Sequence, residues 1–299
     1  MRYSIALPHL GESDEFADPD KLAEVARAIE DAGFDACAVM DHPFPLLRDP
    51  RAGGQAFDMF AMGGYLAAAT TRLAIHLNII VMAYRNPFVV ARCVSTLDHL
   101  AKGRLMVGVG AGYMEAEFVA LGADFSRRGE LVDEGVVAMK AAWSGEPITL
   151  ESTAWSARGN SMLPRPFSDP HPKLFRGGNT KNAIRSAVRH FDGWNPFEAP
   201  SDLAKEARTA AIDSRRAFRE RLTLLRELEQ ETGRATPLEI SLDKPDPRWL
   251  SDGAQSIVEE IEQLEALGVG WLVVYLSGAS AAEVIENVRS FASTVLTSR

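Results

Sequence analysis

EDAGFDACAVMDH, residues 30–42, ends an amphipathic helix, turns at a glycine and continues as an apolar strand that closes on an acid and a histidine. LEALGVGWLVVYL, residues 264–276, repeats the same order of helix, glycine and strand. Glycine just after the last helical turn, here Gly33 and Gly268, is a common helix end because it accepts positive φ at no steric cost. A helix–strand unit that recurs along a chain is typical of a parallel sheet covered by helices.

The same alternation extends from residues 30–42 toward both ends of the chain. We predict strands at residues 3–7, 36–40, 73–82, 105–109, 173–176, 192–195, 238–242 and 271–276. Helices are expected between them, including 18–33, 59–70, a segment from Asn86-Pro87, segments up to Trp143, 180–190, 201–232, 254–267 and a last one through Val284–Phe291. Eight such units predict a (β/α)8 TIM barrel. An open doubly wound sheet would alternate in the same way and stays an alternative.

We expect a single domain over residues 1–299, with an excursion near 145–172, where Pro, Ser and Gly are frequent. Hydrophobic residues make up 46% and charged residues 24% of the chain, as in ordinary globular proteins. The net charge of -9 disfavours nucleic acid and anionic membranes as partners. Two cysteines in apolar runs exclude a disulfide framework and a cysteine zinc site, and no metal is expected. MRYSIALPHL at the start resembles a strand rather than a signal peptide, so we predict a cytoplasmic protein.

Histidines follow the first two predicted strands, at the end where TIM barrels carry their chemistry. His9 comes after the first strand, and Asp41-His42 after the second. His42 can exchange a proton near neutral pH, and Asp41 beside it can orient the ring. Alternatively, Asp41 caps a turn before Pro43 and His42 only packs. His9 is the weaker candidate.

Two polar residues lie inside the third predicted strand. Asn78 needs hydrogen-bond partners there, which a polar cofactor edge or the neighbouring backbone could supply. His76 is expected to be an interior residue without a reactive role.

The glycine-rich stretch GVGAG, residues 108–112, superficially resembles a dinucleotide-binding loop. Tyr113 stands where that motif needs its third glycine, and several strands precede it, so this interpretation is rejected. We instead expect Gly110, Ala111 and Gly112 to let the backbone approach a flat ligand. Tight packing at the strand end is the alternative.

A basic segment, PRPFSDPHPKLFRGGNTKNAIRSAVRHF, covers residues 164–191. It holds six cations against one acid, a local charge of +5. Its Gly177-Gly178-Asn179-Thr180 joins a strand to a helix start, where free amides and the helix dipole attract anions. We predict a phosphate site whose residues are Arg176, Gly177, Gly178, Asn179 and Lys181. A solvated basic helix face is the alternative.

An ordered set of motifs resembles the bacterial luciferase-like superfamily, in particular its coenzyme F420-dependent oxidoreductase branch. The set comprises Asp41-His42, Tyr84-Arg85-Asn86-Pro87, GRLMVGVGAGY (103–113), the Pro-rich run into Gly177-Gly178, and Asp192-Gly193-Trp194. The resemblance implies a TIM barrel with a flavin or deazaflavin ring across its strand ends. It implies His42 as the active-site histidine with Asp41 on the cofactor, a non-proline cis peptide at about Asn78-Ile79, phosphate contacts from Gly177 and Gly178, and a homodimer.

The resemblance predicts an F420-dependent oxidoreductase that transfers a hydride to or from a small organic substrate. The F420 polyglutamate tail is expected to follow the basic segment, with Arg176, Lys181 and Arg185 contributing. Sugar-phosphate dehydrogenases of this branch carry an acid after the strand-four glycines, where this chain has Tyr113, so a sugar-phosphate substrate is not expected.

Three other functions stay open. They are an FMN-dependent monooxygenase that uses oxygen and a separate reductase, a cofactor-binding barrel without catalysis, and a phosphosugar-binding barrel enzyme. The loops at 43–57, 145–172 and 243–252 are expected to set the substrate. HPFPLLRDPRAGGQ, residues 42–55, has the composition of a lid or of a dimer contact.

Overall fold

The chain forms a closed barrel of eight parallel strands. The computed structural model describes residues 1–10, 12–46, 56–246 and 248–296. The strand order around the barrel is β1-β10-β9-β8-β7-β4-β3-β2. The strands are β1 (Arg2–Ala6), β2 (Ala36–Val39), β3 (Ala74–Val81), β4 (Leu105–Gly110), β7 (Lys173–Gly177), β8 (Gly193–Asn195), β9 (Glu239–Lys244) and β10 (Val269–Tyr275). β1 and β2, the first and last strands of this order, also pair with each other, so the sheet closes. This closure confirms the TIM barrel and excludes the open sheet.

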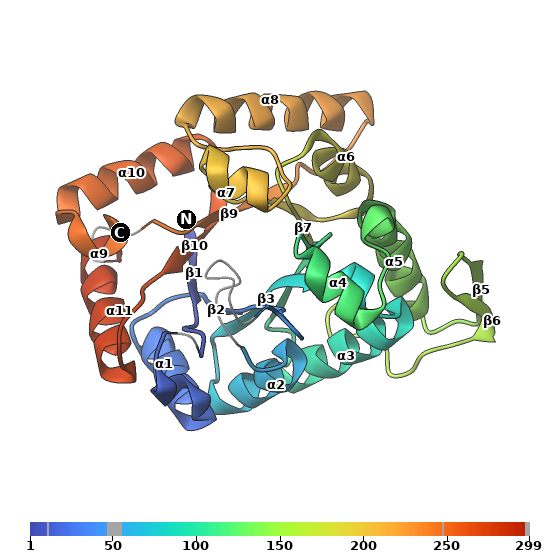
Figure 1. Cartoon of the computed structure of the whole chain (residues 1–299), viewed down its shortest axis with the longest axis horizontal. Coiled ribbons are helices and arrows are strands. Elements are labelled where there is room, and N and C mark those ends of the chain that lie inside the picture. The colour runs from blue at the N-terminus through green and yellow to red at the C-terminus, as the bar shows by residue number, and fades with distance from the viewer. Residues whose placement is uncertain (11, 47–55, 247, 297–299) are drawn as a thin grey trace.

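Helices surround the strands as an outer ring, while α4 and α7 lie over the barrel opening (Figure 1). The helices are α1 (Pro19–Asp31), α2 (Met59–Ala69), α3 (Pro87–Leu100), α4 (Glu115–Leu121), α5 (Arg128–Trp143), α6 (Lys181–His190), α7 (Ser201–Glu206), α8 (Arg215–Glu231), α9 (Arg248–Ser251), α10 (Ala254–Ala266) and α11 (Ala281–Val295). Short 3-10 turns are η1 (Asp14–Ala17), η2 (Met82–Tyr84) and η3 (Phe125–Arg127). The predicted starts at Asp18-Pro19 and Asn86-Pro87 are confirmed, because each polar side chain caps its helix ahead of the proline.

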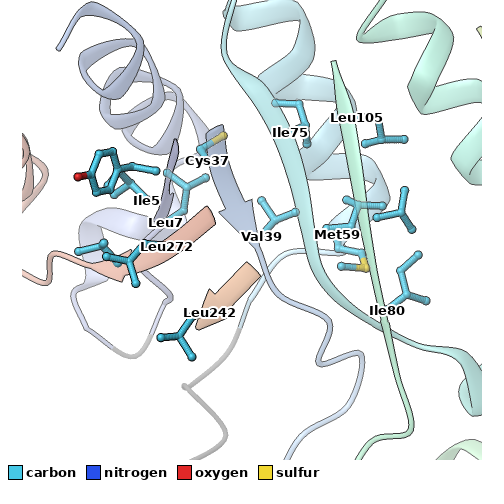
Figure 2. Close-up of a cluster of buried hydrophobic side chains, with 14 of the residues drawn as sticks. Ile5, Leu7, Cys37, Val39, Met59, Ile75, Ile80, Leu105, Leu242 and Leu272 are labelled. Carbon is cyan, nitrogen blue, oxygen red and sulfur yellow. The ribbon is translucent and has the colours of Figure 1, made fainter. Parts of the chain in front are cut away.

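An apolar layer between strands and helices holds the barrel together. Ile5, Cys37 and Ile75 stand side by side on β1, β2 and β3 and are fully buried (Figure 2). Each aliphatic side chain buried in this way stabilises the fold by about 1.5–3 kcal/mol. Burial of this apolar layer therefore holds the strands in place, and the strands in turn position the residues of the site.

The predicted helix over 201–232 is wrong in its middle. It is two helices, α7 and α8, because the backbone of Arg208 is left-handed (φ 47°) and Ala199 pairs with Ile212 in an isolated bridge. Ser214 then caps α8 through the backbone amide of Ala217. The interruption places residues 207–209 at the barrel opening rather than along its flank.

Residues 145–172, where we expected an excursion, contain a β-hairpin that we did not predict. Strands β5 (Ile148–Glu151) and β6 (Ser156–Asn160) form a separate antiparallel pair. The pair lies beyond α5, away from the barrel opening (Figure 1). Of the proposed lid or dimer contact at 42–55, residues 47–55 lie outside the described residues.

Candidate active site

A cavity of about 1040 Å³ opens at the carboxyl ends of the barrel strands. Its size suits an organic ligand, and its position is that of TIM-barrel active sites. Nine of the predicted site residues line it: Asp41, His42, Asn78, Ile79, Ala111, Gly112, Arg176, Gly177 and Gly178. The barrel therefore gathers side chains from β2, β3, β4 and β7 around one space.

Three predicted ligand contacts are not part of the cavity wall. Gly110 makes room for Ile79, because a Cβ at Gly110 would collide with the Ile79 Cδ1 atom. Asn179 is fully buried and holds the following loop through the carbonyls of Phe197 and Ala210. Lys181 is an exposed residue at the start of α6. At Gly110 the packing explanation thus holds rather than close approach to a ligand.

His42 is held by a residue that the sequence analysis missed. Its Nδ1 lies 3.2 Å from Oε2 of Glu117, on α4, and the Glu117 side chain is completely buried. The same carboxylate accepts hydrogen bonds from the Tyr84 hydroxyl and the Phe44 amide, each at 2.8 Å. Burial acts to raise the pKa of Glu117, but the bonds from His42, Phe44 and Tyr84 outweigh it and lower that pKa. Glu117 is therefore an anchored anion that orients the imidazole.

The expectation that Asp41 orients His42 is wrong. Both oxygens of Asp41 accept from Arg85, at 2.6 Å each, and Oδ2 also accepts from the Val81 amide at 2.8 Å. These bonds to Arg85 and Val81 leave little of the carboxylate for a further partner such as His42. Asp41 ties the end of β2 to β3 and to the loop after it. Arg85 was part of the quoted motif, but no role had been assigned to it.

The cis peptide bond expected at Asn78-Ile79 is present, and Asn78 meets another residue that the sequence analysis missed. The Asn78 amide donates to Oδ2 of Asp243 at 2.9 Å, and the Tyr275 hydroxyl donates to the same oxygen at 3.2 Å. Burial raises the pKa of Asp243 to about 6, although both hydrogen bonds favour the ionised form. Asp243 could have been found from the sequence, because it is an acid at the carboxyl end of a barrel strand. We predicted that strand to end at residue 242, one residue before it.

The basic end of the cavity is built around Arg176. This side chain is 4% exposed and donates to the Ser186 hydroxyl at 3.1 Å and to the Gly177 carbonyl. Burial lowers the pKa of Arg176 to about 10, so the guanidinium stays charged at neutral pH. In the described part of the chain no carboxylate lies within 4.0 Å of it. Asp133, which accepts from the Ser186 hydroxyl, is a counter-charge that acts on Arg176 without direct contact and partly offsets the effect of burial on its pKa. A buried cation that faces a cavity without a directly paired carboxylate fits an anionic ligand group.

One expected phosphate contact is already used within the protein. The Gly178 amide donates to the Asn195 carbonyl at 3.2 Å, so it is not a free anion donor. The Thr180 hydroxyl caps α6 through the Ala183 amide. Further arginines line the same cavity: Arg128, Arg185, Arg189 and Arg208. Positive charge at this end therefore comes from side chains more than from backbone amides.

His9 and His76, the other two histidines considered in the sequence, differ in their surroundings. His9 lines the cavity, and its Nε2 lies 3.3 Å from Glu12. Burial lowers the pKa of His9; Glu12 acts against this shift and His42 reinforces it. His76 is fully buried with its Nδ1 3.1 Å from the Ser4 hydroxyl, which confirms the interior position expected for it.

Among the described residues, none of the helices has both the length and the apolar character that a membrane span requires.

Comparison with known proteins identifies the class. The family model of luciferase-like monooxygenases matches residues 1–222, and the chain belongs to this family. An F420-dependent glucose-6-phosphate dehydrogenase of Beutenbergia cavernae is 33% identical over 193 residues, which are 64% of this chain and 56% of the relative. Another, from Nakamurella multipartita, is 27% identical over 308 residues, with 89% of each chain covered. The chain spans 56% and 57% of the length of the first two curated relatives.

Solved structures share the fold. The monooxygenase RslO1 from Streptomyces bottropensis superposes with a TM-score of 0.80 at 20% identity, covering 100% of this chain and 99% of the other. An F420-dependent secondary alcohol dehydrogenase in complex with an F420-acetone adduct gives 0.77 at 19% identity, with the same coverage. At this identity the likeness concerns the barrel alone.

Proposed function

We propose that this protein is an oxidoreductase that binds coenzyme F420 and transfers a hydride between it and a small organic substrate. The observation that carries the proposal is one cavity with two unlike ends. Arg176, buried and without an ion pair among the described residues, lies at one end, and His42 anchored on Glu117 lies at the other. The F420-dependent relatives support the choice of cofactor. We further propose that the chain works as one domain and as a homodimer.

The residues present fit a flavin-type cofactor. Ile79, Ala111 and Gly112 offer an apolar floor at the strand ends, and Arg176 offers charge for a phosphate. Arg128, Arg185 and Arg189 line the cavity and would carry the polyglutamate tail of F420, whereas Lys181, which we had expected there, does not line it. When bound, the deazaflavin supplies the carbon that gives or accepts the hydride, which is the difficult part of the chemistry.

His42 would handle the proton that accompanies the hydride. Because the carboxylate of Glu117 accepts at Nδ1, that nitrogen carries the hydrogen and Nε2 keeps its lone pair. Nε2 can then take a proton from a substrate hydroxyl or return one to a carbonyl. Tyr84 and the Phe44 amide keep Glu117 in place, so the imidazole keeps one tautomer and one orientation.

A sugar phosphate is not the substrate that we propose, although the curated relatives act on one. Tyr113 lines the cavity, and its ring lies edge-on to His42 with 6.0 Å between centroids. A phenol in this position offers a neutral hydroxyl and an aromatic wall instead of a carboxylate. We therefore expect an uncharged, partly apolar substrate.

An FMN-dependent monooxygenase is the second candidate. Glu130 and Asp133 line the basic end of the cavity together with the arginines, which reduces its net positive charge. A short phosphate on Arg176 alone would satisfy that end. This candidate predicts that FMN binds and that Arg185 contributes little.

Fluorescence titration of the purified protein with F420, in parallel with FMN, tests the proposal. F420 should bind more tightly than FMN, and added salt should weaken it because the tail contacts are charged. Arg185→Ala should weaken F420 binding about fivefold, as expected for one exposed charge contact of about 1 kcal/mol. Lys181→Ala, one turn earlier on α6 but off the cavity wall, is the matched control. Preference for FMN would move the assignment to the monooxygenase, and binding of neither would remove it.

A further inference from the structure

Asp243 lies on the opposite side of the barrel from Asn78. Strands β9 and β3 are separated by three strands in either direction around the closed sheet. The 2.9 Å hydrogen bond from the Asn78 amide to Asp243 Oδ2 therefore crosses the barrel opening. Tyr275, on the adjacent β10, donates to the same oxygen. All three side chains line the cavity, so this cross-barrel contact forms part of its floor.

The second carboxylate oxygen of Asp243 is not used by the protein. In the part of the chain that the structure describes, both hydrogen bonds to this side chain end on Oδ2, and no hydrogen bond reaches Oδ1. Nor does a cation lie within 4.0 Å of this carboxylate in those residues. A carboxylate can accept at about four lone-pair positions, and the positions of Oδ1 are not filled by these residues. This oxygen is thus an open acceptor in a ligand cavity.

The groups that surround Asp243 are neutral or turned to other partners. On β10, the pKa of Tyr275 is raised well above its usual value, chiefly by burial, and on β3 burial lowers the pKa of His76 to about 3. On β9 itself, the Lys244 ammonium pairs with Glu198, Asp246 and Glu260. The neighbouring β8 contributes Asn195, which carries no charge. A partner for Oδ1 therefore comes from solvent that enters the cavity or from the ligand that displaces it.

We propose that Asp243 is a ligand-recognition residue whose free Oδ1 accepts a hydrogen bond from an N–H or O–H group of the molecule bound in the cavity. Two sources offer this chemistry, the ring edge of the cofactor and a hydroxyl or amine of the substrate. Since burial raises the pKa of Asp243 to about 6, the acceptor is mostly ionised above that pH and mostly protonated below it. Affinity for the donor-bearing ligand rises as the pH rises through about 6 and then levels off.

The first experiment measures F420 and FMN dissociation constants from about pH 5 to about pH 8 for the wild type and Asp243→Asn. If the cofactor is the donor, the wild type binds about tenfold more weakly at the acidic end, as expected for loss of one hydrogen bond to a charged group. Asp243→Asn binds about tenfold more weakly at the alkaline end and loses the pH dependence. The ligand's own ionisation cancels when the two proteins are compared at one pH. The choice of F420 and FMN as probes rests on the proposed function.

Tyr275→Phe is the matched variant that keeps the carboxylate. It removes a donor that favours the ionised form, so the midpoint of the pH dependence moves to higher pH while the affinity at the alkaline end stays. A role limited to holding the floor together would lower affinity in both variants at every pH. That outcome would overturn the proposal.

A second experiment covers a donor on the substrate and does not need a bound cofactor. The carboxyl of Asp243 is titrated by carbon-13 NMR in the ligand-free wild type, with Asp243→Asn to assign its signal. Addition of 2-propanol or isopropylamine should lower the midpoint, because an added donor favours the carboxylate. If neither cofactor binds the wild type, the proposed function fails while this titration still decides the role of Asp243. A midpoint that no cofactor and neither probe moves would exclude the role.

Discussion

Glu117, buried behind His42, and Asp243, in the cavity wall, are carboxylates whose surroundings shift their pKa values in opposite directions. Burial disfavours the charge of both. Glu117 receives three hydrogen bonds spread over both oxygens, one of them from an imidazole, and its pKa falls below the usual value. Asp243 receives two bonds from neutral groups on a single oxygen, and its pKa rises to about 6. The number of donors, and whether they reach one or both oxygens, decide which buried acid stays ionised. An anion therefore lies behind the cavity wall at Glu117, and a titrating acid lies in the wall at Asp243.

The largest effect on turnover should come from His42, the imidazole that Glu117 orients. We predict that His42→Ala lowers turnover by at least about 100-fold, because the proton then has no positioned acceptor. F420 affinity should change by less than about twofold, since the phosphate end of the cavity is untouched. Steady-state kinetics and a binding titration measure the two quantities. Unchanged turnover would exclude His42 as the acid–base group.

Removal of Glu117 itself should destabilise the fold. Glu117→Ala leaves the Tyr84 hydroxyl and the Phe44 amide without their acceptor and opens a small cavity, so the free energy of unfolding should fall by about 3 kcal/mol. Urea denaturation measures the change. Glu115→Ala, on the same helix but exposed and, among the described residues, ion-paired with Arg208, is the matched control and should stay within about 1 kcal/mol of the wild type. Equal losses in the two variants would mean that the bonds to Glu117 carry little stability.

The two carboxylates should also give opposite pH dependences of stability. The pKa of Asp243 is raised in the fold, so the wild type loses about 2–3 kcal/mol as the pH rises from about 4 through 6. Asp243→Asn removes this loss and should exceed the wild type in stability at neutral pH. The pKa of Glu117 is lowered, so its contribution is present above about pH 4.5 and is lost as the pH falls below it. Denaturation of Asp243→Asn and Glu117→Gln across this range tests both signs, and parallel curves would contradict the comparison.

The sequence predicts the barrel because its information is local. Helix caps, terminal glycines and apolar strands recur within short segments, and eight such units left a closed barrel or an open doubly wound sheet. Closure of the sheet, which depends on distant strands, is shown by the structure. The position of His42 follows from the same logic, since the strand end is visible in the sequence. The resemblance to a known family gave the cis peptide at Asn78-Ile79, which the structure contains.

The partners within the site were harder to predict because they depend on distant residues. Glu117 is 75 positions from His42 and lies on α4, where the acid is buried while the apolar Val119 and Leu121 are exposed, so the local pattern gives no sign of its role. Asp41 was assigned to His42 because the two are adjacent, but neighbouring residues on an extended chain point to opposite sides. Asn78 and Asp243 are 165 positions apart and meet only because the sheet closes. Contacts across a barrel have no local signal.

Ile79 has a consequence for how this scaffold can change. Its side chain fills the space that a Cβ would need at Gly108, Gly110 and Gly177, three positions on two neighbouring strands. Ile79 also lines the cavity, so beside the Asn78–Asp243 contact a single aliphatic side chain helps to set the depth of the cavity. A smaller residue at position 79 would deepen the chamber without moving a strand. A single substitution at Ile79 should therefore change the size of substrate that fits, while His42, Arg176 and Asp243 keep their positions.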